Sequence, residues 1–139
     1  MAAVEFSHKM RVYIEDTDAG GIVYYVNYLK FMERARTEFM RSLGFSKAFI
    51  FNYDLMFVVR DVAVRYLLPA RLDDELVATA TLAHLRGAGM VFQQSVRRGD
   101  EVLAVGTVTI VCVSRTEVKP CRLPREMVER LQPLEQKEI

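Results

Sequence analysis

Apolar residues recur at spacings of three and four along residues 23–43, which is the period of one helix face. Members of this stripe are Tyr28, Met32, Ala35, Phe39 and Leu43. Gly44 follows directly, as glycine commonly does after the last turn of a helix. The pattern predicts one helix of some twenty residues, about 30 Å long and able to cross a whole sheet.

Strand patterns lie on both sides of this helix. In residues 8–14 apolar and polar positions alternate, with Val12 and Ile14 on the same face as Met10. After an aromatic-rich loop over residues 45–57, apolar runs bounded by Gly, Pro and Asp predict four more strands. These strands cover residues 57–68, 75–85, 90–98 and 102–114, and a short helix over residues 124–131 ends the chain.

The order of these elements indicates the fold class. Strands joined by short turns must be antiparallel neighbours. We therefore expect an α+β protein, in which one five-stranded antiparallel sheet carries the long helix on one face. The edge strands of such a sheet need cover, so a homo-oligomer formed by edge pairing is expected.

Composition narrows the class of protein. With 139 residues, 51% hydrophobic and 27% charged, the chain fits one globular domain over residues 1–139. Its net charge of +1 gives no electrostatic basis for binding nucleic acid or an anionic membrane. No apolar run approaches the roughly 20 residues of a membrane span. The N-terminus has no basic segment followed by an apolar stretch, so no secretory signal is expected.

The cysteines and histidines point away from metal chemistry. Cys112 and Cys121, together with His8 and His84, are scattered without the spacing of metal ligands. We expect no metal and no cofactor. Cys112 lies in an apolar run, which predicts a buried thiol, and the cysteine content fits a cytoplasmic protein.

The segment between the first strand and the long helix carries the candidate chemistry. Asp16 and Asp18 precede Gly20 and Gly21, just before the helix start. A helix start presents unpaired N–H groups and a partial positive charge, so an acid beside it can act on a polarised carbonyl. On spacing alone an ordinary cap and turn is the commoner explanation. For Asp16 we expect that structural role, with its carboxylate bonding turn N–H groups.

The same residues resemble a known family, the hot-dog-fold acyl-CoA thioesterases of the 4-hydroxybenzoyl-CoA type. Within it the chain is similar to the bacterial YbgC group, which is associated with the Tol-Pal envelope cluster. The resemblance covers nearly the whole chain and is most specific in the first motif. The matching residues are Asp16-Thr17-Asp18-Ala19-Gly20-Gly21-Ile22-Val23-Tyr24-Tyr25, Asn27-Tyr28, Glu33-Arg34-Ala35-Arg36-Thr37-Glu38, Arg86-Gly87, Phe92, Gln94, Val111-Cys112-Val113, Lys119-Pro120 and Leu123-Pro124.

The resemblance implies a curved antiparallel sheet wrapped around the long helix, assembled as homodimers or homotetramers. It also implies that Asp18 is catalytic and that the backbone N–H of Tyr25 holds the thioester carbonyl oxygen. Three positions depart from the family pattern: many relatives have histidine at Tyr25, serine at Gly89 and aspartate at Ser114. A backbone donor survives the first change, whereas an imidazole role there does not.

Other residues have two interpretations each. The side chains of Tyr24, Tyr25 and Tyr28 line an acyl pocket or pack in the core or an interface, since aromatic residues dominate both. Asn27 contacts substrate or serves the first helical turn. Arg86 and Lys119 are the preferred candidates for the phosphates of coenzyme A, because they lie in loops expected to flank the site.

The resulting hypothesis is a thioester hydrolase that acts on short- to medium-chain or aromatic acyl-CoA. Asp18 acts as the nucleophile or as a general base for water. Two alternatives remain. One is an adaptor that binds acyl carrier protein or an envelope complex with little hydrolysis. The other is a hot-dog dehydratase, which is disfavoured because neither His8 nor His84 lies at the helix start.

Overall fold

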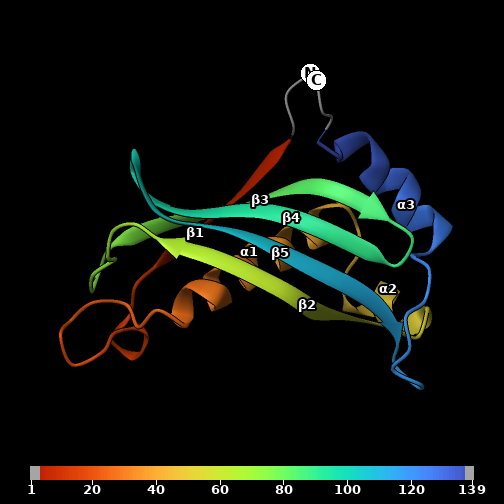
Figure 1. The fold of residues 1–139 in the computed structure, drawn as a ribbon, viewed down its shortest axis with the longest axis horizontal. Coiled ribbons are helices and arrows are strands. Elements are labelled where there is room, and N and C mark those ends of the chain that lie inside the picture. The colour runs from red at the N-terminus through yellow and green to blue at the C-terminus, as the bar shows by residue number, and fades with distance from the viewer. Residues whose placement is uncertain (1–3, 137–139) are drawn as a thin grey trace.

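The computed structural model describes residues 4–136 and contains one five-stranded antiparallel sheet. The strand order is β1-β3-β4-β5-β2, so β1 and β2 are the two edges (Figure 1). The predicted α+β class and antiparallel sheet are confirmed. The strand bounds are Glu5–Arg11 for β1, Leu55–Tyr66 for β2, Glu75–Arg86 for β3, Gly89–Arg98 for β4 and Glu101–Ser114 for β5.

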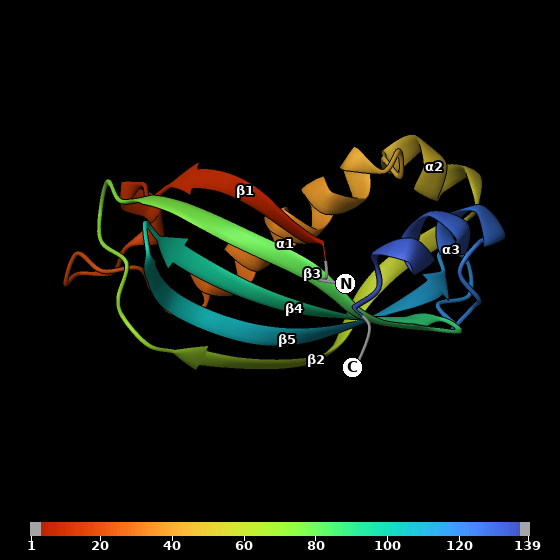
Figure 2. The same cartoon turned by 90° about the horizontal axis from the view of Figure 1, so that it is seen from above.

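The long helix α1, Asn27–Ser42, lies in the concave side of the sheet, which curves around it (Figure 2). The short helix α2, Lys47–Asn52, follows it, and α3, Arg125–Leu131, lies beside the end of β3. Single 3₁₀ turns occur at Ile14–Asp16 and Gln132–Leu134. Within residues 4–136 no helix has the length and apolarity needed to span a bilayer.

The apolar stripe predicted for α1 forms the centre of the core. Tyr28, Met32, Ala35 and Phe39 are buried, and Phe39 packs edge-on against Phe92 of β4. The Met32 side chain of α1 packs directly over Gly106 of β5, where an added Cβ would lie 3.2 Å from it. A glycine at this point therefore lets α1 cross the sheet without a steric clash.

The first part of the chain differs from the prediction at the end of the first strand and at the start of the long helix. β1 ends at Arg11, three residues early, because the chain enters a 3₁₀ turn that leaves Ile14 75% exposed. The helix begins at Asn27 and not near residue 23. Ile22 and Val23 form isolated β-bridges with Arg71 and Thr17, which hold the backbone extended until the turn before α1.

The segment expected to be an aromatic loop contains α2, which the sequence did not predict. Its six residues are too few to show a helical period. Gly44 and Asp54 flank the segment with positive φ angles of 92° and 54°, so each reverses the chain in the left-handed region. The predicted end of α1 at Gly44 is confirmed.

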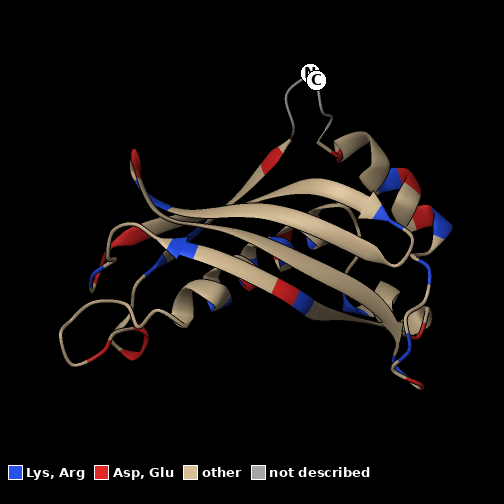
Figure 3. Cartoon of the chain, viewed as in Figure 1, with Lys and Arg blue, Asp and Glu red and all other residues tan. Residues whose placement is uncertain are grey.

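Two ends of the sheet matter for function. At the corner end, β1 finishes, β3 begins and the Asp18 loop projects (Figure 1). At the turn end lie the β3–β4 turn at Gly87 and Ala88 and the last residues of β5. Charged residues are sparse along the central strands and gather on the loops and α3 (Figure 3).

Candidate active site

Asp16 holds the corner together. Its carboxylate accepts the Tyr13 N–H at 2.9 Å, as predicted for an aspartate in a turn. Its carbonyl oxygen accepts two further bonds, from the Tyr24 N–H at 3.0 Å and from the Asn27 side-chain amide at 2.7 Å. Both Asp16 and Asn27 are buried. The loop is thereby tied to the first turn of α1.

Asp18 lies in the next turn with its carboxylate exposed. Its Oδ1 accepts the Gly20 N–H at 2.9 Å. An added Cβ at Gly20 would lie 3.3 Å from that oxygen, and Gly21 has a φ of 80°. The two glycines therefore let the chain fold back tightly around the carboxylate and fix its orientation while leaving it open to a ligand.

Tyr25 precedes α1 and supplies the second predicted group. Within residues 4–136, no hydrogen bond uses the Tyr25 N–H as donor, whereas the Asn27 and Tyr28 N–H groups bond back to the carbonyls of Tyr24 and Tyr25. The helix dipole adds partial positive charge at this end. The Tyr25 amide is thus free to bind an oxygen that carries negative charge.

The tyrosines of this region divide into buried and exposed. Tyr28 is buried, and its hydroxyl accepts the Ala70 N–H at 2.9 Å, so this side chain packs in the core. Tyr24 and Tyr25 are 48% and 58% exposed, with ring centroids 4.9 Å apart. Tyr66 contacts both Tyr25 and Tyr28. Partial burial, and then these two neighbours, raise the pKa of Tyr66.

The remaining predicted contacts are spread over the molecule. The Asn27 side-chain amide donates a hydrogen bond to the Asp16 carbonyl, which favours a role in the first helical turn over contact with substrate. Arg86 and Lys119 lie at the turn end of the sheet, and β3 alone places roughly 35 Å of strand between that end and the corner. One chain therefore does not bring Arg86 or Lys119 to Asp18, and their binding of coenzyme A stays a prediction.

Two of the positions that depart from the family pattern also lie at the turn end. Gly89 begins β4, and an added Cβ there would meet no atom closer than 3.5 Å. Ser114 ends β5, where its hydroxyl donates to the Asp54 carboxylate at 3.2 Å. Neither residue lies near Asp18 within the chain.

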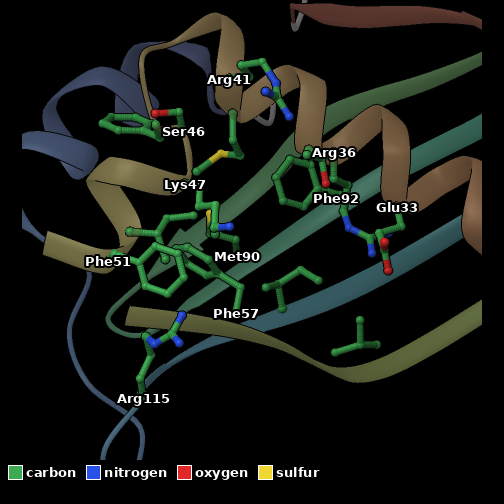
Figure 4. Close-up of a pocket in the computed structure, with 16 residues that line it drawn as sticks. Glu33, Arg36, Arg41, Ser46, Lys47, Phe51, Phe57, Met90, Phe92 and Arg115 are labelled. Carbon is green, nitrogen blue, oxygen red and sulfur yellow. The ribbon is translucent and has the colours of Figure 1, made fainter. Parts of the chain in front are cut away.

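A cavity of about 380 Å³ lies between α1, α2 and the sheet (Figure 4). Its walls are mostly apolar and include Phe45, Phe57, Met90 and Phe92. The sequence did not predict it, because it depends on α2 folding over the sheet. The one available signal was the aromatic content of residues 45–57.

The two candidate reacting residues and the cavity lie in different parts of the chain. Neither Asp18 nor Tyr25 lines this cavity or either of two further cavities of residues 4–136, one on the polar outer face and one near Arg86. In the same range, no group of three or more His, Cys, Asp and Glu could hold a metal ion. Cys112 is buried as predicted. Its pKa is raised to about 12, mainly by burial and in addition by the contact with the Cys121 thiol at 3.6 Å.

Comparisons with known proteins agree on one family. The family model for the thioesterase superfamily matches residues 20–105. The chain is 42% identical over 123 residues to a Haemophilus influenzae protein called acyl-CoA thioesterase YbgC, covering 88% of this chain and 90% of that one. A solved probable thioesterase from Bartonella henselae superposes with a TM-score of 0.83 at 34% identity, covering 87% of this chain and 100% of that one.

A more distant structural neighbour shares the fold. The Staphylococcus aureus protein SAV2348, solved in complex with CoA, superposes with a TM-score of 0.89 and covers 100% of this chain and 90% of that one. At 16% identity this likeness concerns the fold alone.

Proposed function

The chain belongs to the thioesterase superfamily and has the hot-dog fold, and from this premise we propose that it hydrolyses acyl-CoA thioesters at the corner of Asp18 and Tyr25. The observation that carries the proposal is a fixed, exposed carboxylate on the loop that leads into α1, beside a helix-start N–H without a partner. The Haemophilus influenzae relative, named an acyl-CoA thioesterase, supports the same substrate class.

The proposed mechanism needs only these two groups and water. The Tyr25 N–H donates to the thioester carbonyl oxygen as negative charge develops, and one donor of this kind contributes about 3–4 kcal/mol. Asp18 either attacks the carbonyl carbon, giving a mixed anhydride that water hydrolyses, or takes a proton from the attacking water. On both routes the C–S bond breaks, coenzyme A leaves as the thiol and the acyl group leaves as the carboxylic acid.

The acyl group needs a pocket that the corner lacks within one chain. We assign this role to the cavity between α1 and α2, whose size of about 380 Å³ falls in the usual range for small-molecule sites. It is about two and a half times the 150 Å³ apolar cavity that accommodates benzene. Short- to medium-chain and aromatic acyl groups fit such a space.

A homodimer brings corner and cavity together. β2 is a twelve-residue edge strand that carries the exposed apolar residues Val59 and Val62. The opposite edge, β1, has seven residues and presents Glu5, Lys9 and Arg11, which discourage edge pairing. A two-fold dimer that pairs β2 with β2 antiparallel continues the sheet across the interface.

This pairing places the two halves of the site side by side. Tyr66 ends β2 and contacts Tyr25 at the corner, whereas Phe57, near the start of β2, lines the cavity. Antiparallel pairing sets the start of one β2 against the end of the other. The corner of one protomer then adjoins the cavity of its partner, and two composite sites form per dimer.

The direct test replaces Asp18 with asparagine, which keeps the size of the side chain and removes its charge. Release of the coenzyme A thiol from butyryl-, hexanoyl- and benzoyl-CoA should fall by about 10³-fold or more, because nucleophilic and base catalysis are both lost. Glu15→Gln is the matched control, since Glu15 is an exposed carboxylate in the same loop. Turnover retained in Asp18→Asn would rule out the proposed site.

A single-turnover reaction in ¹⁸O-labelled water tests the nucleophilic route. Label in the Asp18 carboxylate shows that an anhydride formed and that water added to its Asp18 carbonyl carbon, whereas label in the released acid alone results from base catalysis or from water adding to the acyl carbon of the anhydride. Mass spectrometry of the peptide containing Asp18 distinguishes these results.

The alternative role as an adaptor makes a different prediction. An adaptor captures acyl carrier protein or Tol-Pal components in a pull-down while acyl-CoA stays intact. The proposed enzyme hydrolyses acyl-CoA whether or not it binds such partners.

We place the protein in the cytoplasm, a location supported by the two free cysteines, Cys112 and Cys121.

A further inference from the structure

The charges around the proposed acyl cavity are strongly one-sided. Four cations and one carboxylate line it, against a floor of apolar side chains. The charged members are Arg36, Arg41, Lys47, Arg115 and Glu33. A cavity that accepts only neutral acyl chains gains nothing from a cation in its wall, and a cation that is buried there costs desolvation energy.

Three of these cations already have partners. Arg41 forms an ion pair with Glu38 at 3.3 Å. Lys47 and Arg115 lie over the ring of Phe51, at 5.4 Å and 4.0 Å from its centroid, on the α2 side of the cavity. Arg115 is also exposed to solvent. These three charges are accounted for by side chains of the protein and by water.

Arg36 differs from them. It projects from α1 on the opposite wall and is partly buried (Figure 4). In the described part of the chain it forms no ion pair. Burial lowers its pKa, and the negative charge of the exposed Glu33 offsets this in part. Its charge is thus desolvated without a carboxylate in contact.

Gln94 fixes the position of this guanidinium. Arg36 Nη1 donates to Gln94 Oε1 at 2.8 Å, and the buried Gln94 amide nitrogen donates to the Met32 and Thr79 carbonyls at 2.9 Å and 3.1 Å. The Gln94 oxygen therefore faces Arg36 and cannot exchange places with the nitrogen. One of the five guanidinium N–H donors is used by this bond. The others are available to a ligand in the cavity.

We propose that the cavity takes an acyl group ending in a carboxylate, so that the preferred substrate is the mono-coenzyme A thioester of a dicarboxylic acid. The methylene chain lies against the apolar floor, and Arg36 binds the distal carboxylate, whose two oxygens match the fork of a guanidinium. This inference rests on the proposed function and adds the polarity of the acyl group to it.

The test compares acyl groups of equal length with and without the distal carboxylate. For the wild-type protein, kcat/KM for adipyl-CoA should exceed that for hexanoyl-CoA by about tenfold or more. Arg36→Met keeps the volume and removes the charge, so it should abolish this preference while hexanoyl-CoA is still hydrolysed. Arg34→Met is the matched control, because Arg34 is an exposed arginine of the same helix that does not line the cavity, and it should keep the preference.

The other outcomes overturn either the inference or the proposed function, and they can be told apart. A wild-type enzyme that hydrolyses hexanoyl-CoA as fast as adipyl-CoA, or an Arg36→Met variant that loses both activities equally, makes Arg36 structural and leaves the proposed hydrolysis standing. Absence of hydrolysis of both compounds refutes the proposed function instead. In that case calorimetric titration with adipate decides the inference alone: wild-type binding that Arg36→Met or Arg36→Lys weakens supports it, and equal binding refutes it.

Discussion

The corner at Asp18 and the cavity beneath α2 are built in opposite ways. At the corner, backbone hydrogen bonds fix an exposed carboxylate and leave the Tyr25 N–H free within residues 4–136, but neither residue lines the cavity under α2. Under α2, a cavity of about 380 Å³ has apolar walls and cations but lacks a carboxylate at a helix start. One region has groups suited to the reaction and the other has space for the substrate.

This difference is the basis of the proposal that the functional unit is a homodimer. Rigid main-chain geometry at the corner suits chemistry, because reacting groups must be held in fixed positions. The cavity is bounded on one side by α2, which packs on the core through the partly buried Phe49 and Ile50. In the proposed dimer, pairing of two β2 edges joins the two regions.

The largest expected effect comes from a substitution that blocks β2 pairing and so separates the corner from the cavity. Val62→Lys puts a charge in the middle of the β2 edge, where Val62 is 43% exposed, and charged residues on an edge strand block pairing. We expect a folded monomer by sedimentation velocity, with acyl-CoA hydrolysis reduced by about 100-fold or more because the site is incomplete.

A lysine at an exposed valine away from this edge is the control. Val4 is 49% exposed and precedes β1, so Val4→Lys should leave both assembly and hydrolysis unchanged. A Val62→Lys protein that is monomeric and fully active would mean that one chain contains the whole site.

A smaller effect is expected at the contact between Met32 of α1 and Gly106 of β5. Gly106→Val forces a side chain against Met32 and Val64, each 3.2 Å from an added Cβ. Such overpacking costs typically 1–3 kcal/mol of the free energy of unfolding, measured by urea denaturation. Thr107→Val, one residue along β5 with an exposed side chain, should change stability by less than about 0.5 kcal/mol. Equal stabilities for the two variants would show that α1 does not pack closely on Gly106.

The smallest effect concerns the loop that supports the corner. Asp74 accepts hydrogen bonds from Arg98 at 2.7 Å and from the Arg71 N–H at 2.8 Å, and the same loop carries the Ala70 carbonyl that accepts the Val23 N–H. Burial alone would raise the pKa of Asp74, but the bonds from Arg98 and Arg71 outweigh it and lower the pKa.

The sign of the pH effect follows from that direction. A carboxyl with a lowered folded-state pKa stabilises the protein above its unfolded pKa, about 3.9, and loses this contribution as pH falls through the folded value. Asp74→Asn should therefore cost about 1–2 kcal/mol at pH 7, and the difference should vanish in acid. Asp73→Asn is the control, since asparagine tolerates the φ of 69° at this position. A pH-independent loss in Asp74→Asn would contradict the ion-pair explanation.

The sequence was informative wherever local chemistry decides the structure. The stripe from Tyr28 to Phe39, the stop at Gly44 and the role of Asp16 in the turn were all predictable. The start of α1 was not, because Val23 is held extended by a bond to Ala70, some fifty residues away in the chain. The position of the Arg36 side chain was not predictable either, because it depends on a hydrogen bond to Gln94 in β4.

Subunit mixing tests the composite site most directly. Asp18→Asn removes the carboxylate, and Thr37→Trp fills the cavity from an exposed position of α1, so each homodimer should be inactive. After joint unfolding and refolding, half of the dimers are mixed, and each has one intact corner facing one intact cavity. The mixture should then regain up to about one quarter of wild-type hydrolysis. A mixture no more active than the two variants measured separately would contradict a site shared between subunits.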